Sequence, residues 1–306
     1  MSDHLPRVAV LLAAYNGMAW IEAQVASILA QTRVNVSLYI SVDPSTDGTE
    51  AWCADYARIH PNIHVLAQAG PFGGAAPNFF RLIRDVDFSA FDYVSFADQD
   101  DFWYPDKLER ALAALGAGSF DGYSSNVVAF WPDGRRLLVN KAQPQVQWDH
   151  YFEAAGPGCT YVLSRVLADA FKRLVTERWQ RVQDVSLHDW LCYAFARSAG
   201  FKWFIDPVPS MDYRQHPNNQ FGVNAGLGSA VARVRKVIQG WWFAQVRLIC
   251  ELTAEKNSQD TVARILAQSG RFSLFRLIMR ARECRRRGRD QLVLAAFCGL
   301  SAFRRR

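Results

Sequence analysis

The sequence predicts an α/β fold in which a mostly parallel central sheet is flanked by helices and followed by a helical C-terminal extension. In the first hundred residues strand-like and helix-like segments alternate, as they do in parallel sheets with helices on both faces. Gly and Asp residues gather in the connections after the strands, where such sheets bind ligands. Past Gly226 the pattern changes to long helices with one apolar face.

Apolar spacing predicts each element in turn. The expected strands are 7–14, 36–42, 63–66 and 93–97, and the helices between them are 18–30, 47–59 and 78–86. A hairpin turn is indicated at 131–134, a strand at 161–163 with Ser164 capping the next helix, and a helix over 186–199. The residues expected on one face of the first C-terminal helix are Val231, Val234, Ile238, Trp241, Leu248 and Leu252.

The change of pattern predicts a main domain over residues 1–225 and a basic helical extension over 226–306. Hydrophobic residues make up 50% of the 306 residues and charged residues 21%, which indicates a globular protein. The six cysteines lack zinc-like spacing and are expected to be buried, reduced thiols of a cytosolic protein. The apolar run at 8–14 is too short for a signal peptide, and no apolar stretch reaches the roughly 18 residues of a membrane span.

The net charge of +6 is unevenly distributed. From Val231 to the end there are 17 Lys+Arg and 5 Asp+Glu, giving +12, whereas the rest has 18 and 24, giving −6. A basic tail on an acidic body indicates contact with an anionic surface, either a membrane or nucleic acid. Basic residues beside aromatic and apolar ones favour an interfacial membrane helix. The alternative is packing on the main domain or on a second subunit, as in a homo-oligomer.

An acidic cluster, Asp98-Gln99-Asp100-Asp101, follows the apolar strand 93–97 and precedes a helix that begins near Pro105. Carboxylates this close repel each other unless a cation lies among them. Hard oxygen ligands suit Mg²⁺ or Mn²⁺, which proteins usually share with substrate phosphates. The alternative is an acidic turn that caps the helix.

Two predicted strands and a glycine loop end in candidate binding residues. Tyr15, after the first strand, could stack on a flat ring or close an edge of the core. Asp43, after the second strand, could accept a hydrogen bond from a nucleobase N–H. The loop with Gly73 and Gly74 precedes a helix and could cradle an anion or only turn the chain.

Two polar segments lie later in the main domain. Asp189, in the first turn of the helix 186–199, could cap that helix or act as a general base. Its neighbour His188 competes for the role of base, or else orients a substrate or faces solvent. Arg214 and His216 share one loop and suit contact with phosphate or metal, the alternative being a polar loop with its histidine in solvent.

Together these segments resemble the family 2 glycosyltransferases, which have the GT-A fold. The motifs occur in the family's order over roughly residues 7 to 220: A-x-Y-N-G at 13–17, V-D-x-S-x-D-G-T at 42–49, GG-x-x-x-N-F at 73–79, F-A-D-Q-D-D-x-W-x-P-D-K-L at 96–108 and H-D-W at 188–190. The segment Y-R-Q-H-x-N-N at 213–219 is similar to the rhamnosyltransferase-like branch.

The resemblance implies a nucleotide-sugar-binding half over about 1–115 and an acceptor half over about 116–225. The residues it assigns to the nucleotide-sugar are Tyr15, Asp43, Gly73, Gly74, Asn78, Asp98 and Arg214. It assigns Asp100 to a divalent metal, Mn²⁺ or Mg²⁺, on the donor diphosphate, with Asp98 and His216 as further ligands. Asp189 is implied as the base that deprotonates the acceptor, whereas the family often has an acidic residue where His188 stands.

These roles imply an inverting, metal-dependent glycosyltransferase acting on a glycan or lipid-linked acceptor in cell-surface polysaccharide synthesis. The expected donor is dTDP-rhamnose, with a UDP-sugar as the alternative, and the expected place is the cytoplasm, peripherally at the inner membrane face. Two other classes stay open. A nucleotidyltransferase is disfavoured because no basic triphosphate loop lies near the N-terminus, and a nucleic-acid-binding protein because the tail's charges accompany apolar faces.

Overall fold

The computed structural model describes residues 4–216, 240–254, 260–268 and 270–304. Its contacts divide the chain into two units. The first unit comprises Met1–Ala142, Gly156–Asp189 and Phe201–Gly222, and the second Gln143–Ala155, Trp190–Gly200 and Val223–Arg306. Two segments that precede residue 225 thus group with the C-terminal helices, and the division into domains of 1–225 and 226–306 stays a prediction.

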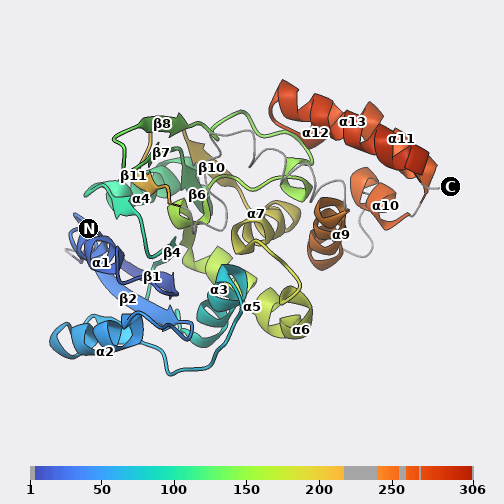
Figure 1. The fold of residues 1–306 in the computed structure, drawn as a ribbon. Coiled ribbons are helices and arrows are strands. Elements are labelled where there is room, and N and C mark those ends of the chain that lie inside the picture. The colour runs from blue at the N-terminus through green and yellow to red at the C-terminus, as the bar shows by residue number, and fades with distance from the viewer. Residues whose placement is uncertain (1–3, 217–239, 255–259, 269, 305–306) are drawn as a thin grey trace. The chain divides into compact units, whose positions relative to one another are not determined.

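The first unit is built on a seven-stranded sheet with the order β10-β6-β9-β4-β1-β2-β3. Only β9 runs antiparallel to its neighbours, so the sheet is mixed but mostly parallel, and the predicted α/β class is confirmed. In Figure 1 β1 and β2 run side by side. The strands are β1 (Arg7–Ala14), β2 (Asn35–Val42), β3 (Ile63–Val65), β4 (Tyr93–Ala97), β6 (Gly122–Ser125), β9 (Val162–Ser164) and β10 (Trp203–Asp206).

Helices between the strands cover this sheet, and α3 packs on both β1 and β2. α2 and α7 each begin two residues after their predicted starts, and two other helices begin three residues away from theirs. α1 starts three residues late because Gly17 O first accepts from Trp20 N in a turn, and α3 starts three residues early, directly after the Gly73-Gly74 pair. The helices are α1 (Ile21–Leu29), α2 (Thr49–Ile59), α3 (Ala75–Asp85), α4 (Lys107–Gly118), α5 (Arg165–Glu177), α6 (Trp179–Val182), α7 (His188–Ser198) and the short η2 (Gly158–Thr160).

A second sheet of the same unit has the order β5-β11-β7-β8. Its strands are β5 (Phe102–Trp103), β7 (Val127–Phe130), β8 (Arg136–Val139) and β11 (Met211–Arg214). The predicted hairpin joins β7 and β8, and Gly134 adopts a φ of 85° in its turn. The predicted cap is also present, because Ser164 Oγ accepts from Leu167 N at 3.3 Å. β5 was not predicted, although its pairing with β11 brings the 211–214 strand beside the acidic cluster.

The second unit is helical. It contains η1 (Asp149–Tyr151), most of α7, α9 (Trp241–Thr253), α10 (Thr261–Ala267), α11 (Arg271–Met279), α12 (Ala281–Cys284) and α13 (Gly288–Arg304). α11 and α13 pack against each other, and Figure 1 draws them in adjacent red ribbons. Of the predicted helical face, Leu248 is buried, whereas Val231, Val234 and Ile238 lie outside the described residues. All six cysteines are buried and free, as predicted.

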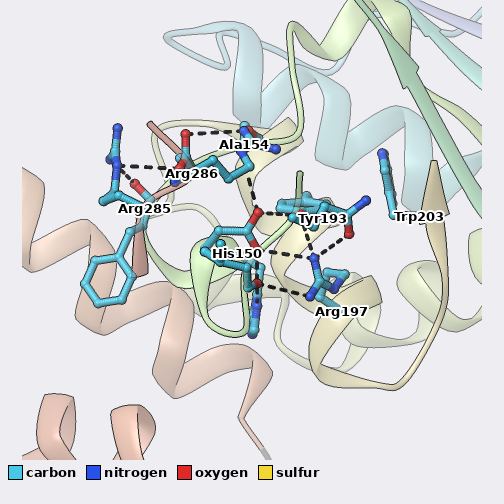
Figure 2. A network of polar contacts seen from close by, with 12 residues as sticks. His150, Ala154, Tyr193, Arg197, Trp203, Arg285 and Arg286 are labelled. Carbon is cyan, nitrogen blue, oxygen red and sulfur yellow. Dashed lines mark hydrogen bonds and ion pairs between the residues drawn. The ribbon is translucent and has the colours of Figure 1, made fainter. Parts of the chain in front are cut away.

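A buried polar network holds the second unit together (Figure 2). Asp149 is fully buried and accepts from Tyr193 Oη at 2.9 Å and from Arg197 at 3.2 Å, while Arg286 Nε lies 3.6 Å from its carboxylate. Arg286 also donates to Glu153 at 3.3 Å. The network therefore ties η1 to α7 and to the segment between α12 and α13.

None of the described helices is both long and apolar enough to cross a bilayer.

Candidate active site

The acidic cluster lies where the sequence predicts, directly after β4. Asp100 is buried, and its Oδ2 lies 2.6 Å from Nε2 of His216. The His216 ring stacks on Trp20 with 4.1 Å between the ring centroids. The structure thus brings two of the three predicted metal ligands into contact and packs the histidine against an aromatic ring.

β11 supplies a second set of contacts to the cluster. The Asp101 carboxylate is fully buried and accepts from the backbone N–H of Arg214 at 3.2 Å. Arg214 Nε donates to the carbonyl oxygen of Asp100 at 2.8 Å, and its guanidinium lies over Phe130, 4.7 Å from the ring centroid. Arg214 therefore braces the backbone of the cluster.

The electrostatics of the cluster favour a bound cation. Burial raises the pKa of Asp98 to about 7, and the charges of Asp100 and Asp189 add to this effect. Asp98, Asp101 and Cys159 offer one ligand atom each within 4.8 Å of one another. Burial also raises the pKa of the Cys159 thiol well above its usual value, so it stays protonated and is no ligand for a hard ion. The carboxylates fit a divalent cation, since its charge would offset their repulsion.

A buried lysine interacts electrostatically with Asp101 of the cluster. Lys107 is fully buried at the start of α4, and its Nζ lies 3.4 Å from the centroid of the Trp103 ring. Burial lowers the pKa of Lys107 to about 7, while the charge of Asp101 acts in the opposite direction. Cationic charge at this position is therefore costly, and the ring face and Asp101 are what favour it.

Tyr15 presents an exposed ring on a backbone that is held in place. Its exposed fraction is 56%, which suits stacking on a flat ligand. Gln99 Oε1 accepts from Tyr15 N at 2.7 Å, and Gln99 Nε2 donates to Tyr15 O at 2.8 Å. A Cβ on Gly17 would lie 2.5 Å from Gln99 Oε1, so a glycine is needed for this approach. The residue between Asp98 and Asp100 thus fixes the end of β1.

Asp43 and the glycine loop form one structure. Asp43 N donates to Ala14 O at 2.8 Å, which places the ends of β1 and β2 together. The buried Asp43 carboxylate accepts from Phe72 N at 2.8 Å and from Gly73 N at 3.3 Å. Gly73 adopts a φ of 74°, which a side chain would strain. The predicted nucleobase residue therefore also orders the loop before α3.

Asn78 and Arg81 of α3 fasten this helix to β2. Asn78 Nδ2 donates to Ser41 O at 3.0 Å, and Arg81 donates to Ser41 Oγ at 2.8 Å. Both side chains are almost fully buried. Among the described residues the Oδ1 atom of Asn78 has no hydrogen-bond partner.

His188 and Asp189 differ sharply although they are neighbours. His188 is buried and stacks on Phe79 with 3.8 Å between the ring centroids, so it does not face solvent. Burial lowers its pKa to about 3, and the ring is neutral at physiological pH. Asp189 is partly exposed, and its charge acts on Asp98. A Cβ on Gly158 would lie 2.8 Å from His188 Nε2 and 2.9 Å from Asp189 Cβ, which only a glycine avoids.

Comparison with known proteins identifies the family. The profile of Glycosyl transferase family 2 matches residues 9–157. The dTDP-rhamnosyl transferase RfbG of Shigella flexneri is 44% identical over 247 residues, which cover 80% of this chain and 86% of that protein. The chain belongs to glycosyltransferase family 2. A second relative, the putative teichuronic acid biosynthesis glycosyltransferase TuaG of Bacillus subtilis, is 36% identical over 40% of this chain and 49% of its own length.

Solved structures show that this glycosyltransferase has the GT-A fold. Residues 1–349 of TarS from S. aureus, in complex with UDP-GlcNAc, match with a TM-score of 0.59 and 14% identity, over 95% of this chain and 80% of that chain. The mannosyltransferase PcManGT from Pyrobaculum calidifontis, in complex with GDP-Man and Mn²⁺, matches with a TM-score of 0.53 and 16% identity, over 99% and 82%. Membership of glycosyltransferase family 2 sets aside the nucleotidyltransferase and nucleic-acid-binding alternatives.

Several residues of the candidate site were not predicted from the sequence. Gln99 and Lys107 lie inside the motif at 96–108, but no role was assigned to either. Trp20 and Cys159 reach the site only through the fold, by ring stacking and by the turn at η2. For the first pair, placement within a motif was the available signal; the second pair carries no local signal.

Proposed function

We propose that this glycosyltransferase transfers L-rhamnose from dTDP-rhamnose to a glycan or lipid-linked acceptor, with a divalent metal and with inversion at the anomeric carbon. The observation that carries the donor is the 44% identity to the dTDP-rhamnosyl transferase over 86% of its length. A cytoplasmic place at the inner membrane face fits a lipid-linked acceptor, and it belongs to the same proposal.

The donor would lie along the C-terminal ends of β1, β2 and β4. The exposed Tyr15 ring stacks on the nucleobase, and the Asp43 carboxylate retains lone pairs that can accept from a base N–H. Asp100 and Asp98, with His216, would hold Mn²⁺ or Mg²⁺. The metal supplies positive charge to the departing diphosphate. Gly73 and Gly74 directly precede α3 and would lie beside the donor, while Asn78, whose side chain is almost fully buried, would hold the start of that helix through Ser41 O.

Asp189 would accept the proton of the acceptor hydroxyl as that oxygen attacks the anomeric carbon. The neighbouring His188 is a poor rival, because burial against Phe79 holds its pKa near 3 and leaves it little basicity. One base suffices for a single displacement, in which the hydroxyl attacks opposite the leaving diphosphate and the configuration inverts.

The test is a panel of dTDP-rhamnose, UDP-glucose, UDP-GlcNAc and GDP-mannose, with Mn²⁺, Mg²⁺ or a chelator, read as release of nucleoside diphosphate. Release from dTDP-rhamnose alone, abolished by the chelator, is the expected result. Preference for another donor would reject the rhamnosyl assignment. Activity that survives chelation would reject the metal, and a transfer product that retains the donor's anomeric configuration would reject the single displacement.

A further inference from the structure

α11 exposes an apolar strip to solvent. Phe272 and Met279 are each 85% exposed and Phe275 is 50% exposed, which is unusual for side chains of this size. The opposite side of the helix is anchored in the second unit, since Leu274 and Leu277 are buried. The strip therefore lies on a helix whose opposite face is packed in the core of the unit.

Arginines border the strip on both sides. At about 100° per residue, Phe275, Met279 and Phe272 fall within roughly 60° of one another on the helix. Arg271 lies about 40° beyond one edge and Arg276 about 40° beyond the other, and both are exposed. An apolar strip flanked by long cationic side chains is the pattern of a helix that lies in a lipid interface.

Exposed apolar residues are concentrated in this part of the unit. Fourteen large apolar side chains are exposed among the described residues, and six of them belong to α11 and α13, which pack together. The members on α13 are Leu292, Val293 and Leu300. Such a concentration marks an interaction surface.

The charges of α11 favour a lipid surface over a second copy of the chain. The helix contains two arginines and neither aspartate nor glutamate. In a two-fold symmetric dimer the same surface meets itself, so these arginines would approach like charges. Anionic headgroups offer the opposite charge on a fluid surface, and each arginine can extend toward them while the apolar strip enters the interface.

We propose that the strip of Phe272, Phe275 and Met279, with Arg271 and Arg276 at its borders, docks the protein on an anionic phospholipid surface. The inference extends the proposed function, because a lipid-linked acceptor would be held in such a surface, but the geometry of α11 carries it independently of the donor.

The experiment measures co-sedimentation of the full chain with phosphatidylcholine vesicles and with vesicles that also contain phosphatidylglycerol. The wild type is expected to bind the anionic vesicles at least about tenfold more tightly. The triple variant Phe272→Gln/Phe275→Gln/Met279→Gln should weaken that binding on the order of 100-fold, since three apolar side chains no longer enter the interface. Arg271→Gln/Arg276→Gln should weaken it on the order of tenfold at low salt.

Matched controls come from the first unit. Ile59→Gln replaces an apolar residue that is 72% exposed on α2, and Arg33→Gln/Arg58→Gln removes two charges whose side chains are 78% and 77% exposed. Both controls should bind vesicles like the wild type, and all variants should keep the wild-type rate of donor hydrolysis.

Equal binding to the two vesicle types, or a triple variant that binds like the wild type, would overturn the inference. So would a wild-type dimer that the triple variant converts to monomers without any vesicle binding, which would assign the strip to a second copy. Vesicle binding as expected, but without hydrolysis of any donor, would refute the proposed function and leave the docking surface standing.

Discussion

Two buried carboxylate clusters, one in each unit, differ in how their charge is balanced. Burial raises the pKa of Asp149, and the charges of Arg286 and Arg197 act against that effect. Burial also raises the pKa of Asp98, but there the neighbouring charges of Asp100 and Asp189 act in the same direction. In the second unit, arginines supply positive charge beside the buried carboxylate of Asp149. In the first unit, the neighbouring charges that act on Asp98 at the end of β4 are negative.

The difference separates a structural network from a proposed binding site. A buried carboxylate that is paired within the chain orders the elements around it and has no need of a ligand. A buried carboxylate whose charged neighbours oppose its ionisation, as Asp100 and Asp189 do for Asp98, is held at a cost in stability, and such costs gather at functional sites. The comparison predicts that equivalent substitutions in the two clusters will affect different properties.

Asp189→Asn is expected to have the largest effect. Transfer should fall by roughly 10²–10⁴-fold, because the amide cannot accept the acceptor proton, while donor and metal binding stay as in the wild type. Steady-state transfer and calorimetric donor binding would be measured together. Near wild-type turnover by Asp189→Asn, combined with an inactive His188→Ala, would reverse the assignment of the base.

Asp149→Asn should act on folding. The change leaves Arg197 and Arg286 without their buried anion, and breaking a buried pair in this way costs about 3–5 kcal/mol of unfolding free energy. Urea denaturation measures the loss, and Asp55→Asn, which removes an exposed partner of Arg58, is the control expected to cost less than about 1 kcal/mol. A loss as small as that of the control would mean that the network does not hold the second unit.

Asp100→Asn should act on ligand binding. Removing a like charge beside Asp98 should leave the metal-free protein at least as stable as the wild type. Affinity for the donor in the presence of Mn²⁺ should fall by at least about 100-fold. This loss is larger than the one expected for a residue that only hydrogen-bonds to a metal ligand. Isothermal calorimetry tests the binding, and a variant that unfolds as readily as Asp149→Asn would show that both clusters are structural.

Acid should destabilise both units through their buried histidines. Burial lowers the pKa of His188 in the first unit and of His150 in the second to about 3, from an ordinary value of 6.5. Below pH 6.5 the unfolded chain therefore binds protons that the folded chain excludes, and stability is lost as the pH falls toward 3. Between pH 7 and pH 5 each histidine should cost roughly 2 kcal/mol.

Urea denaturation at the two pH values would compare the wild type with His188→Phe and His150→Phe, which keep an aromatic ring without a titrating group. Each variant should lose less stability than the wild type on acidification. An unchanged difference between pH 7 and pH 5 would contradict the neutral, buried state of the histidine concerned.

Gln99→Ala should have the smallest effect. It removes two hydrogen bonds to the Tyr15 backbone, each worth about 1 kcal/mol, so nucleotide affinity should fall on the order of tenfold without loss of the metal site. Gly17→Ala displaces the same side chain. The affinity of the double variant for nucleotide should therefore be no lower than that of the single variant with the lower affinity. Additive losses would mean that the two residues act through separate contacts.

The sequence predicted the parts of this molecule whose signals are local. β1 and β4 are short apolar runs bounded by turn residues, a pattern that indicates buried strands, and the acidic motif marked the end of β4. β5 has two residues and therefore no periodicity, and the burial of His188 depends on Phe79, more than a hundred positions away. The Asp149 network joins segments just as distant, which explains why residues 143–155 were not grouped with the C-terminal helices.

The clamp between Gln99 and Tyr15 has a mechanical consequence. Because Gln99 lies between Asp98 and Asp100 and hydrogen-bonds to both the N–H and the carbonyl of Tyr15, the end of β1 and the acidic turn are held together. In the proposed binding mode, this contact would set the distance along the nucleotide from the Tyr15 ring to the proposed metal ligands. A nucleoside diphosphate has a set length from base to β-phosphate, and a monophosphate is shorter. The proposed site would therefore distinguish the diphosphate from the monophosphate by length as well as by charge.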